Sequence, residues 1–208
     1  MLAREGVLRR QVAAARHPED WPGYTVYRRH ELVVWAQDLM REAGLPVPRD
    51  AEALELALLL EDQITPEMIP LPGALELVKA LAGHNGRRLF IASGAPSFYS
   101  RQCLQGAGML KYFERVLGPD VVDTLKTGPD YYRRAFDVTD LSPDECAVVD
   151  DSTGPLAWAL QVGVKVVVAV GKAAKEPIAG APAGERLIRA SSLTEVADIV
   201  DHLGWPEG

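Results

Sequence analysis

The feature that most limits the fold of this chain is an alternation between short apolar runs and amphipathic helical patterns, which starts at Pro72 and continues to residue 203. Short apolar runs rich in β-branched residues, of which Val164 to Val170 is the strongest, predict strands that are buried on both faces. Strands separated by helices imply right-handed crossovers and a parallel sheet. The chain is therefore predicted to be an α/β protein with a parallel sheet covered by helices.

The apolar runs and the helical patterns give approximate bounds for each element. Strands are expected at residues 88–92, 114–117, 146–149, 164–170 and 186–188. Helices between and after them are expected at residues 73–82, 96–106, 130–136, 153–162 and 194–203. The part before Pro72 reads as helical, with helices expected at residues 2–16, 26–43 and 51–62 and with Asp50 as the N-cap of the last one.

Composition and charge exclude several classes of function. The 208-residue chain has a formal net charge of -7, which argues against a nucleic-acid surface because binding a phosphate backbone usually requires a basic patch. No apolar run approaches the roughly 18 residues of a membrane span, and the N-terminus has no apolar signal core. Cys103 and Cys146 are read as buried free thiols of a reducing compartment, with a disulfide as the alternative. The sequence therefore predicts a cytoplasmic protein with no nucleic-acid or membrane partner.

Polar side chains gather at the predicted carboxyl ends of two strands, where parallel sheets bind ligands. Ser93 and Gly94 follow one apolar run, Asp150 and Asp151 end another, and Lys126 stands just ahead of a helix. A hydroxyl, an ammonium and a carboxylate pair suit magnesium-dependent phosphoryl transfer, which needs the phosphoryl oxygens neutralised and held in line. Adjacent carboxylates at a strand end can give Mg²⁺ one direct ligand and one through water.

With these motifs in this order, residues 70–203 resemble the haloacid dehalogenase-like hydrolase superfamily, whose members are mostly phosphatases. In that resemblance Ser93 is similar to the second-motif hydroxyl, which binds the transferring phosphoryl group. Lys126 resembles the third-motif lysine, which neutralises phosphate and nucleophile charge. Asp150 and Asp151 resemble the fourth motif, whose acidic residues hold Mg²⁺.

The same resemblance implies an overall architecture and a substrate class. It implies a Rossmann-like parallel sheet flanked by helices, with a small helical cap. The cap would be residues 24–68, and the core would be residues 1–23 together with residues 69–208. The implied ligand is a small phosphorylated molecule, bound with Mg²⁺ in the phosphate site formed by Ser93, Gly94 and Lys126.

The first motif of the family, an apolar strand ending in Asp-x-Asp-x-Thr, has no counterpart in the sequence. Its first Asp is the nucleophile and its second is the general acid/base. The nearest candidate nucleophile is Asp20, but Pro22 replaces the second Asp and Tyr24 replaces the Thr. The residues before Asp20 do not form an apolar run, and proline is excluded from central strands. In the family this strand lies mid-sheet, between those that carry Ser93 and Asp150.

Three hypotheses follow from this gap. The chain is a catalytically impaired member of phosphatase ancestry that serves as a phosphate-ligand binding or regulatory module. Alternatively, it is an active magnesium-dependent phosphatase of a small phosphorylated metabolite that uses Asp20 or an unusual nucleophile. In the third hypothesis the missing strand comes from an upstream segment or another subunit, which predicts an exposed sheet edge or a split between the strands of Ser93 and Asp150. A missing central strand also favours homo-oligomers.

Overall fold

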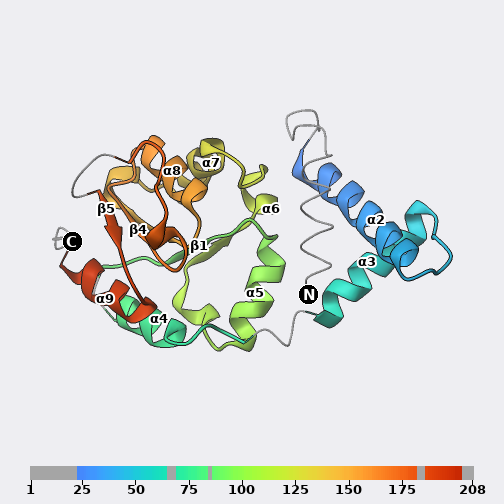
Figure 1. The fold of residues 1–208 in the computed structure, drawn as a ribbon, viewed down its shortest axis with the longest axis horizontal. Coiled ribbons are helices and arrows are strands. Elements are labelled where there is room, and N and C mark those ends of the chain that lie inside the picture. Colours follow the sequence, from blue (N-terminus) through green and yellow to red (C-terminus); the bar gives the residue numbers. More distant parts are fainter. Residues whose placement is uncertain (1–22, 65–68, 84–85, 182–185, 203–208) are drawn as a thin grey trace. The chain divides into compact units, whose positions relative to one another are not determined.

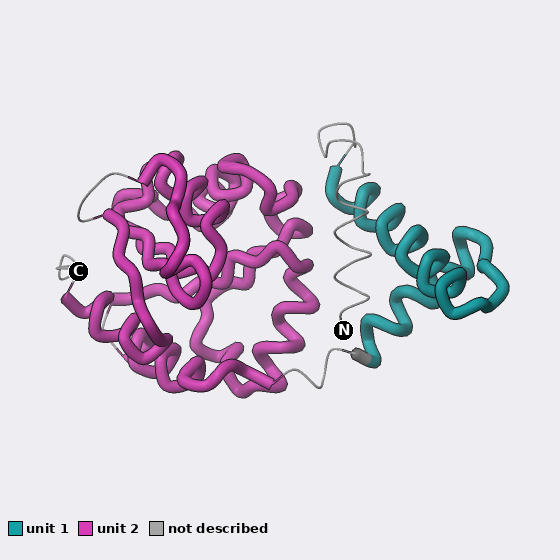
Figure 2. The backbone as a smooth tube through the Cα atoms, viewed as in Figure 1, with its two compact units in different colours: residues 1–67 teal, residues 68–208 magenta. Residues whose placement is uncertain are grey.

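The computed structural model describes residues 23–64, 69–83, 86–181 and 186–202, which divide between two compact units, residues 1–67 and 68–208 (Figure 2). The first unit contains a helical hairpin in which α2 (Tyr24–Glu42) packs on α3 (Asp50–Ile64). The guanidinium of Arg28 pairs with Glu31 on its own helix and with the buried Glu61 of α3. Across all of these ranges, no helix is long and apolar enough to cross a membrane.

The hairpin has close to the predicted bounds, with one correction at the start of its second helix. Asp50 is the first residue of α3 and does not cap it. Its carboxylate accepts a hydrogen bond from Gln37 Nε2 (3.1 Å), and the amide of Arg49 donates instead to the carboxylate of Glu52 (3.1 Å). Residues 1–22, with the predicted helix at 2–16, lie outside the described residues. The assignment of residues 1–23 to the core and of residues 24–68 to a cap stays a prediction.

The second unit contains the predicted alternation of strands and helices (Figure 1). Its strands are β1 (Phe90–Ala92), β2 (Arg115–Leu117), β3 (Ala147–Asp150), β4 (Val166–Ala169) and β5 (Leu187–Arg189). Its helices are α4 (Ala74–Ala82), α5 (Ser97–Gly106), α6 (Pro119–Val122), α7 (Pro129–Thr139), α8 (Thr153–Gln161) and α9 (Leu193–Asp201). Short 3-10 helices are η3 (Leu110–Tyr112), η4 (Pro143–Glu145) and η5 (Ala173–Lys175). The strands and helices predicted from Pro72 onward are all present, and α6 is an addition.

The strands form two parallel sheets, which confirms the predicted α/β class. β1 pairs with β2, with Phe90 opposite Arg115. β3, β4 and β5 form the second sheet in that order, with Asp150 opposite Ala169. In the part of the chain that the structure describes, no ladder of hydrogen bonds joins β1 to β3. A split between the strands that carry Ser93 and Asp150 is therefore present, as the third hypothesis expects.

Burial is most complete along β4, the middle strand of the three-stranded sheet. The side chains of β4 alternate between a cluster with α7 and α8 and a cluster with α4 and α9, as a doubly covered strand requires. All four residues of β4 are buried. By contrast, β1 and β3 have no fully buried residue. β5, at the outer edge of the second sheet, also has no fully buried residue, so β4 is the strand that is covered along its whole length.

Candidate functional site

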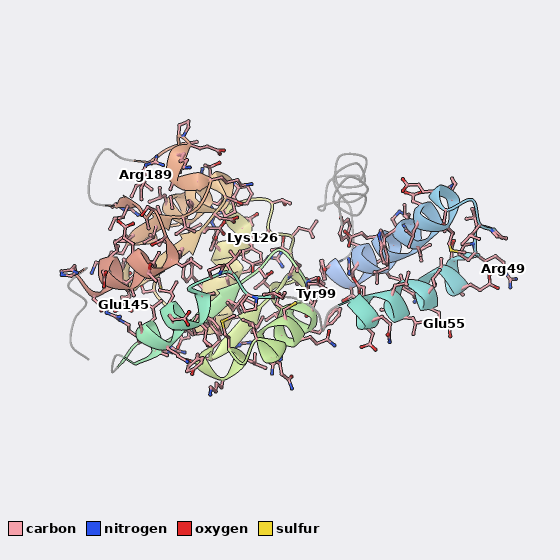
Figure 3. The ribbon with its side chains drawn as sticks, turned by 60° about the horizontal axis from the view of Figure 1, so that its bottom comes forward. Arg49, Glu55, Tyr99, Lys126, Glu145 and Arg189 are labelled. Carbon is pink, nitrogen blue, oxygen red and sulfur yellow. The ribbon has the colours of Figure 1, made fainter. Side chains whose placement is uncertain are left out.

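Lys126 and Asp150 meet at the carboxyl ends of β1 and β3. Lys126, labelled in Figure 3, lies in the loop before α7, whose start is set by Gly128 at the N-cap and a proline after it. Its ammonium donates to Asp150 Oδ2 at 2.8 Å and to the carbonyl of Ala92 at 2.9 Å. The Lys126 and Asp150 side chains are 10% and 14% exposed. A largely buried ion pair therefore links one strand of each sheet across the split.

Asp151 is exposed beside this ion pair and faces the solvent side of the strand end. The other oxygen of Asp150, Oδ1, accepts a hydrogen bond from the amide of Ser152 at 2.9 Å. Mg²⁺ prefers oxygen ligands and usually takes only one or two carboxylates from a protein, because water and phosphate oxygens fill its other positions. Two adjacent carboxylates fit this preference. Within the described ranges no cluster of three or more acidic, His or Cys side chains could hold a metal ion. The residues present thus fit Mg²⁺ only as a partial ligand set.

Ser93 and Gly94 lie at the end of β1, next to Lys126. The Ser93 amide donates to the carbonyl of Leu117 at 2.9 Å, and its Oγ accepts a hydrogen bond from the amide of Ala95 at 3.0 Å. The Ser93 hydroxyl still carries a proton that it can donate to a phosphate oxygen. A Cβ built on Gly94 would lie 3.8 Å from the Lys126 Cβ, so the backbone of Gly94 runs directly beside the lysine. The structure therefore brings the predicted hydroxyl and lysine to one end of the sheet.

Two tyrosines of α7 surround Lys126 and differ in their hydrogen bonding. The Tyr131 hydroxyl lies 2.8 Å from the carbonyl of Leu117 and 3.0 Å from that of Ser93, which ties β1 and β2 together at their ends. The Tyr132 hydroxyl is buried and has no hydrogen-bond partner among the described residues. Burial, and then the charge of Asp150, raises the pKa of Tyr132, and burial also raises the pKa of Tyr131. Both hydroxyls are therefore protonated donors at neutral pH.

A cavity of about 240 Å³ lies along the split. It is lined by all three residues of β1 and all four of β3 on its sides, by several residues of α7, and by Lys126. Its volume far exceeds the roughly 10–15 Å³ that one water molecule needs. Tyr132 lines this cavity, and Val149, which also lines it, is 36% exposed although it lies in the middle of a strand. The split is thus a real groove between the two sheets.

The predicted nucleophile candidate, Asp20, lies outside the described residues, so its distance from Asp151 stays untested. The sequence reasoning assigned no role to the hydroxyls of Tyr131 and Tyr132. Their position two and three residues after Pro129 at the start of α7 was visible in the sequence. Which hydroxyl is satisfied depends on contacts with strand ends distant in sequence, and no local pattern encodes those contacts.

Comparison with known proteins identifies the family. The sequence profile of the haloacid dehalogenase-like hydrolases matches residues 4–163. This chain belongs to the haloacid dehalogenase-like hydrolase family.

Among proteins of known sequence, a phosphoglycolate phosphatase of Rhodospirillum rubrum is 32% identical over 136 residues, which cover 65% of this chain and 54% of that protein. An uncharacterised protein of Haemophilus influenzae is 23% identical over 63% of this chain and 64% of its own length. The chain therefore spans 54% and 64% of the lengths of these two relatives, less than two thirds of each.

Solved structures share the fold at low sequence identity. A defluorinating L-2-haloacid dehalogenase has a TM-score of 0.64 at 19% identity, covering 95% of this chain and 76% of its own. The L-2-haloacid dehalogenase of Xanthobacter autotrophicus, with chloropropionic acid covalently bound, has a TM-score of 0.60 at 18% identity, covering 84% and 77%. These similarities support the Rossmann-like α/β fold that the sequence predicted.

Proposed function

We propose that this chain carries the phosphate-binding and magnesium-binding side of a phosphatase-type site and is catalytically impaired as it stands. The observation that carries the proposal is the convergence of Lys126 and Asp150, 2.8 Å apart, beside Ser93 and Gly94 at the carboxyl ends of β1 and β3. A largely buried ammonium at such a position offers a fixed positive charge to a phosphate group. The family supports a hydrolase, and the 32% identical phosphatase favours phosphate esters over other substrates.

Each polar group has a role in binding under this proposal. The Ser93 hydroxyl and the amide of Gly94 donate to phosphate oxygens, and Lys126 neutralises their charge. Asp151 and Asp150 hold Mg²⁺, which when bound neutralises phosphoryl oxygens as a Lewis acid. Lys126 also holds the Asp150 carboxylate in place through their hydrogen bond.

The impairment follows from the missing nucleophile motif. Asp20 is the nearest stand-in that the sequence offers, and the prolines around it are unsuited to a central strand. No second acid stands two residues later to protonate a leaving group, because that position is Pro22. The bound phosphate ester would therefore lack both an attacking carboxylate and an acid.

A turnover assay tests this proposal. The full chain is incubated with MgCl₂ and either p-nitrophenyl phosphate or 2-phosphoglycolate, and phosphate release is compared for the wild type, Asp20→Asn and Lys126→Met. We expect no release by the wild type above the Lys126→Met background and no effect of Asp20→Asn. Turnover that Asp20→Asn abolishes would instead establish the second candidate, an active phosphatase, which the identity to the Rhodospirillum rubrum phosphatase favours.

Binding distinguishes a phosphate-binding module from a site that has lost all function. Isothermal titration of inorganic phosphate into the wild type in the presence of Mg²⁺ should give a measurable affinity. Lys126→Met should weaken that affinity at least tenfold, because one charged hydrogen-bond donor is worth about 1.5–3 kcal/mol. Equal affinities for the two proteins would contradict the assignment of Lys126 as the phosphate lysine.

A further inference from the structure

The loop that follows β4 passes directly beside the acidic end of β3. The amide of Val170 donates to the carbonyl of Asp150 at 3.1 Å, so the pairing of the two strands extends to the last residue of β3. The next residue, Gly171, has a φ of +57°, and a Cβ built on it would lie 3.7 Å from the Cβ of Asp151. This loop therefore borders the carboxylate end of the candidate site.

Contacts from β5 and from the core hold this loop in place. At the end of β5, Arg189 Nη1 lies within 3.0 Å of three carbonyl oxygens of the loop, those of Ala173, Ala174 and Glu176. The Ala173 side chain is fully buried in the cluster formed with α7 and α8. The helix η5 is thus anchored at its first residue. The backbone of Lys172, one residue earlier, is therefore fixed between this anchor and Gly171.

Lys172 provides a positive charge that no carboxylate of the described residues neutralises. Its side chain is exposed, as is that of Asp151. Within the described ranges Lys172 takes part in no ion pair, whereas Lys126 is paired with Asp150. A lysine ammonium stands on a flexible four-carbon stem, so it can reach groups around its backbone position. The loop therefore presents a cation to a ligand that lies over Asp151.

The charges at the strand ends leave a role for this cation. Lys126 and Asp150 offset each other at 2.8 Å. Asp151 together with Mg²⁺ leaves one net positive charge, whereas a phosphate monoester carries close to two negative charges at neutral pH. A ligand with a further anionic group would thus lack positive charge at this site unless another cation lay within reach.

We propose that Lys172 is a specificity-determining residue that binds a second anionic group, such as a carboxylate, on a small phosphorylated ligand. The inference rests on the proposed function, because it requires the phosphate group to lie at Ser93 and Lys126. A ligand that extends from there over Asp151 approaches the loop after β4, because β4 pairs with β3 and neighbouring strands lie roughly 4.8 Å apart. Lys126 then neutralises the phosphate group and Lys172 the second group.

Two ligands of similar size test this role, because 2-phosphoglycolate has a carboxylate where ethyl phosphate has a methyl group. Each is titrated calorimetrically into the full chain in the presence of MgCl₂. The wild type should bind 2-phosphoglycolate about fivefold more tightly than ethyl phosphate, as one solvent-exposed ion pair allows. Lys172→Met should abolish this preference and change the affinity for ethyl phosphate less than twofold. Lys172→Arg keeps the charge and should keep the preference.

A matched control removes the same charge elsewhere on the core. Lys79 is exposed on α4, which precedes the amino end of β1, and Lys79→Met should change neither affinity. Raising NaCl from 0.05 to 0.5 M should reduce the wild-type preference, because salt screens exposed charges.

The outcomes separate this inference from the proposed function. Equal affinities of the wild type for the two ligands, or a preference that Lys172→Met retains, would overturn the role of Lys172. If inorganic phosphate still bound in a manner dependent on Lys126, the proposed function would stand. Equal loss of both ligands in Lys172→Met would show that this lysine serves the phosphate group itself, which also overturns the inference. A wild type that binds neither ligand nor inorganic phosphate would refute the proposed function and this inference with it.

Discussion

Tyr131 and Tyr132 provide a matched pair of substitutions that test whether the groove is unfilled in the free chain. Both side chains are buried, at 0% and 2% exposure, and their rings pack edge to face with centroids 5.5 Å apart. Replacing either one with Phe keeps the ring and removes only the hydroxyl. The two variants therefore differ in hydrogen bonding alone.

The two variants are expected to change the free energy of unfolding differently. Tyr131→Phe removes contacts to two backbone carbonyls, at 2.8 and 3.0 Å, and should destabilise the unit by about 1–2 kcal/mol. Tyr132→Phe removes a buried hydroxyl with no partner among the described residues, so it should leave stability unchanged or raise it by about 1 kcal/mol. With a urea m-value of about 2 kcal/mol/M, the two midpoints should differ by roughly 1 M.

Hydrogen-exchange mass spectrometry in increasing urea gives the appropriate readout. Peptides that span β4 report the unit that contains both tyrosines, whereas a whole-chain signal would also include the helical hairpin. If Tyr132→Phe lowers the urea midpoint as much as Tyr131→Phe does, the Tyr132 hydroxyl has a partner in the free protein. The reasoning about an unfilled groove would then be wrong.

Two further perturbations test the ion pair and a helix cap. Lys126→Met leaves the largely buried Asp150 carboxylate without its ammonium and should lower the free energy of unfolding in urea by about 3 kcal/mol. The double variant Lys126→Met with Asp150→Asn should recover at least about 1 kcal/mol of that loss. Additive losses would show that the pair is not coupled. Hydrogen bonds from the hydroxyl of Ser191, and then from its amide, lower the pKa of Glu195 in the folded chain. The Glu195 carboxylate therefore stabilises the fold above its unfolded pKa of about 4.3. This contribution to stability is lost as the pH falls through the folded pKa. The difference in melting temperature between wild type and Glu195→Gln should be constant at neutral pH and shrink below about pH 4; a difference that persists unchanged into acid would exclude this role.

The positions of the strands were predictable because burial on both faces forces continuous apolar runs. Val166 to Ala169 contacts helices on each face, and its sequence contains little else than β-branched residues. The short helix α6 was not predictable in the same way. Gly118 precedes it because a Cβ there would lie 2.3 Å from the amide of Ser97, and Asp120 accepts hydrogen bonds from that same serine at 2.5–2.6 Å. Such constraints arise between segments distant in sequence and leave no periodic signal.

The places of the candidate site residues in the fold were predictable, whereas the contacts between them were only partly so. The sequence placed Ser93 and Asp150 at strand ends and Lys126 just ahead of a helix, and in the structure the Lys126 ammonium lies 2.8 Å from Asp150 Oδ2. The pattern did not reveal that Lys126 also bonds to the carbonyl of Ala92, because this contact depends on the space between β1 and β3. Cys103 and Cys146 form no disulfide, as predicted, but both are half-buried where their apolar neighbours predicted full burial.

Two helices explain how a sheet with a split between its strands can hold its shape. On one face, α4 contributes Leu77 to the cluster around β4 and Leu75 and Val78 to the cluster with β1 and β2. On the other face, the two tyrosines of α7 join Leu117 of β2 and Val167 of β4 in a single cluster. Each half-sheet is thus anchored to the same pair of helices, and the distance between β1 and β3 is set by packing above and below the groove.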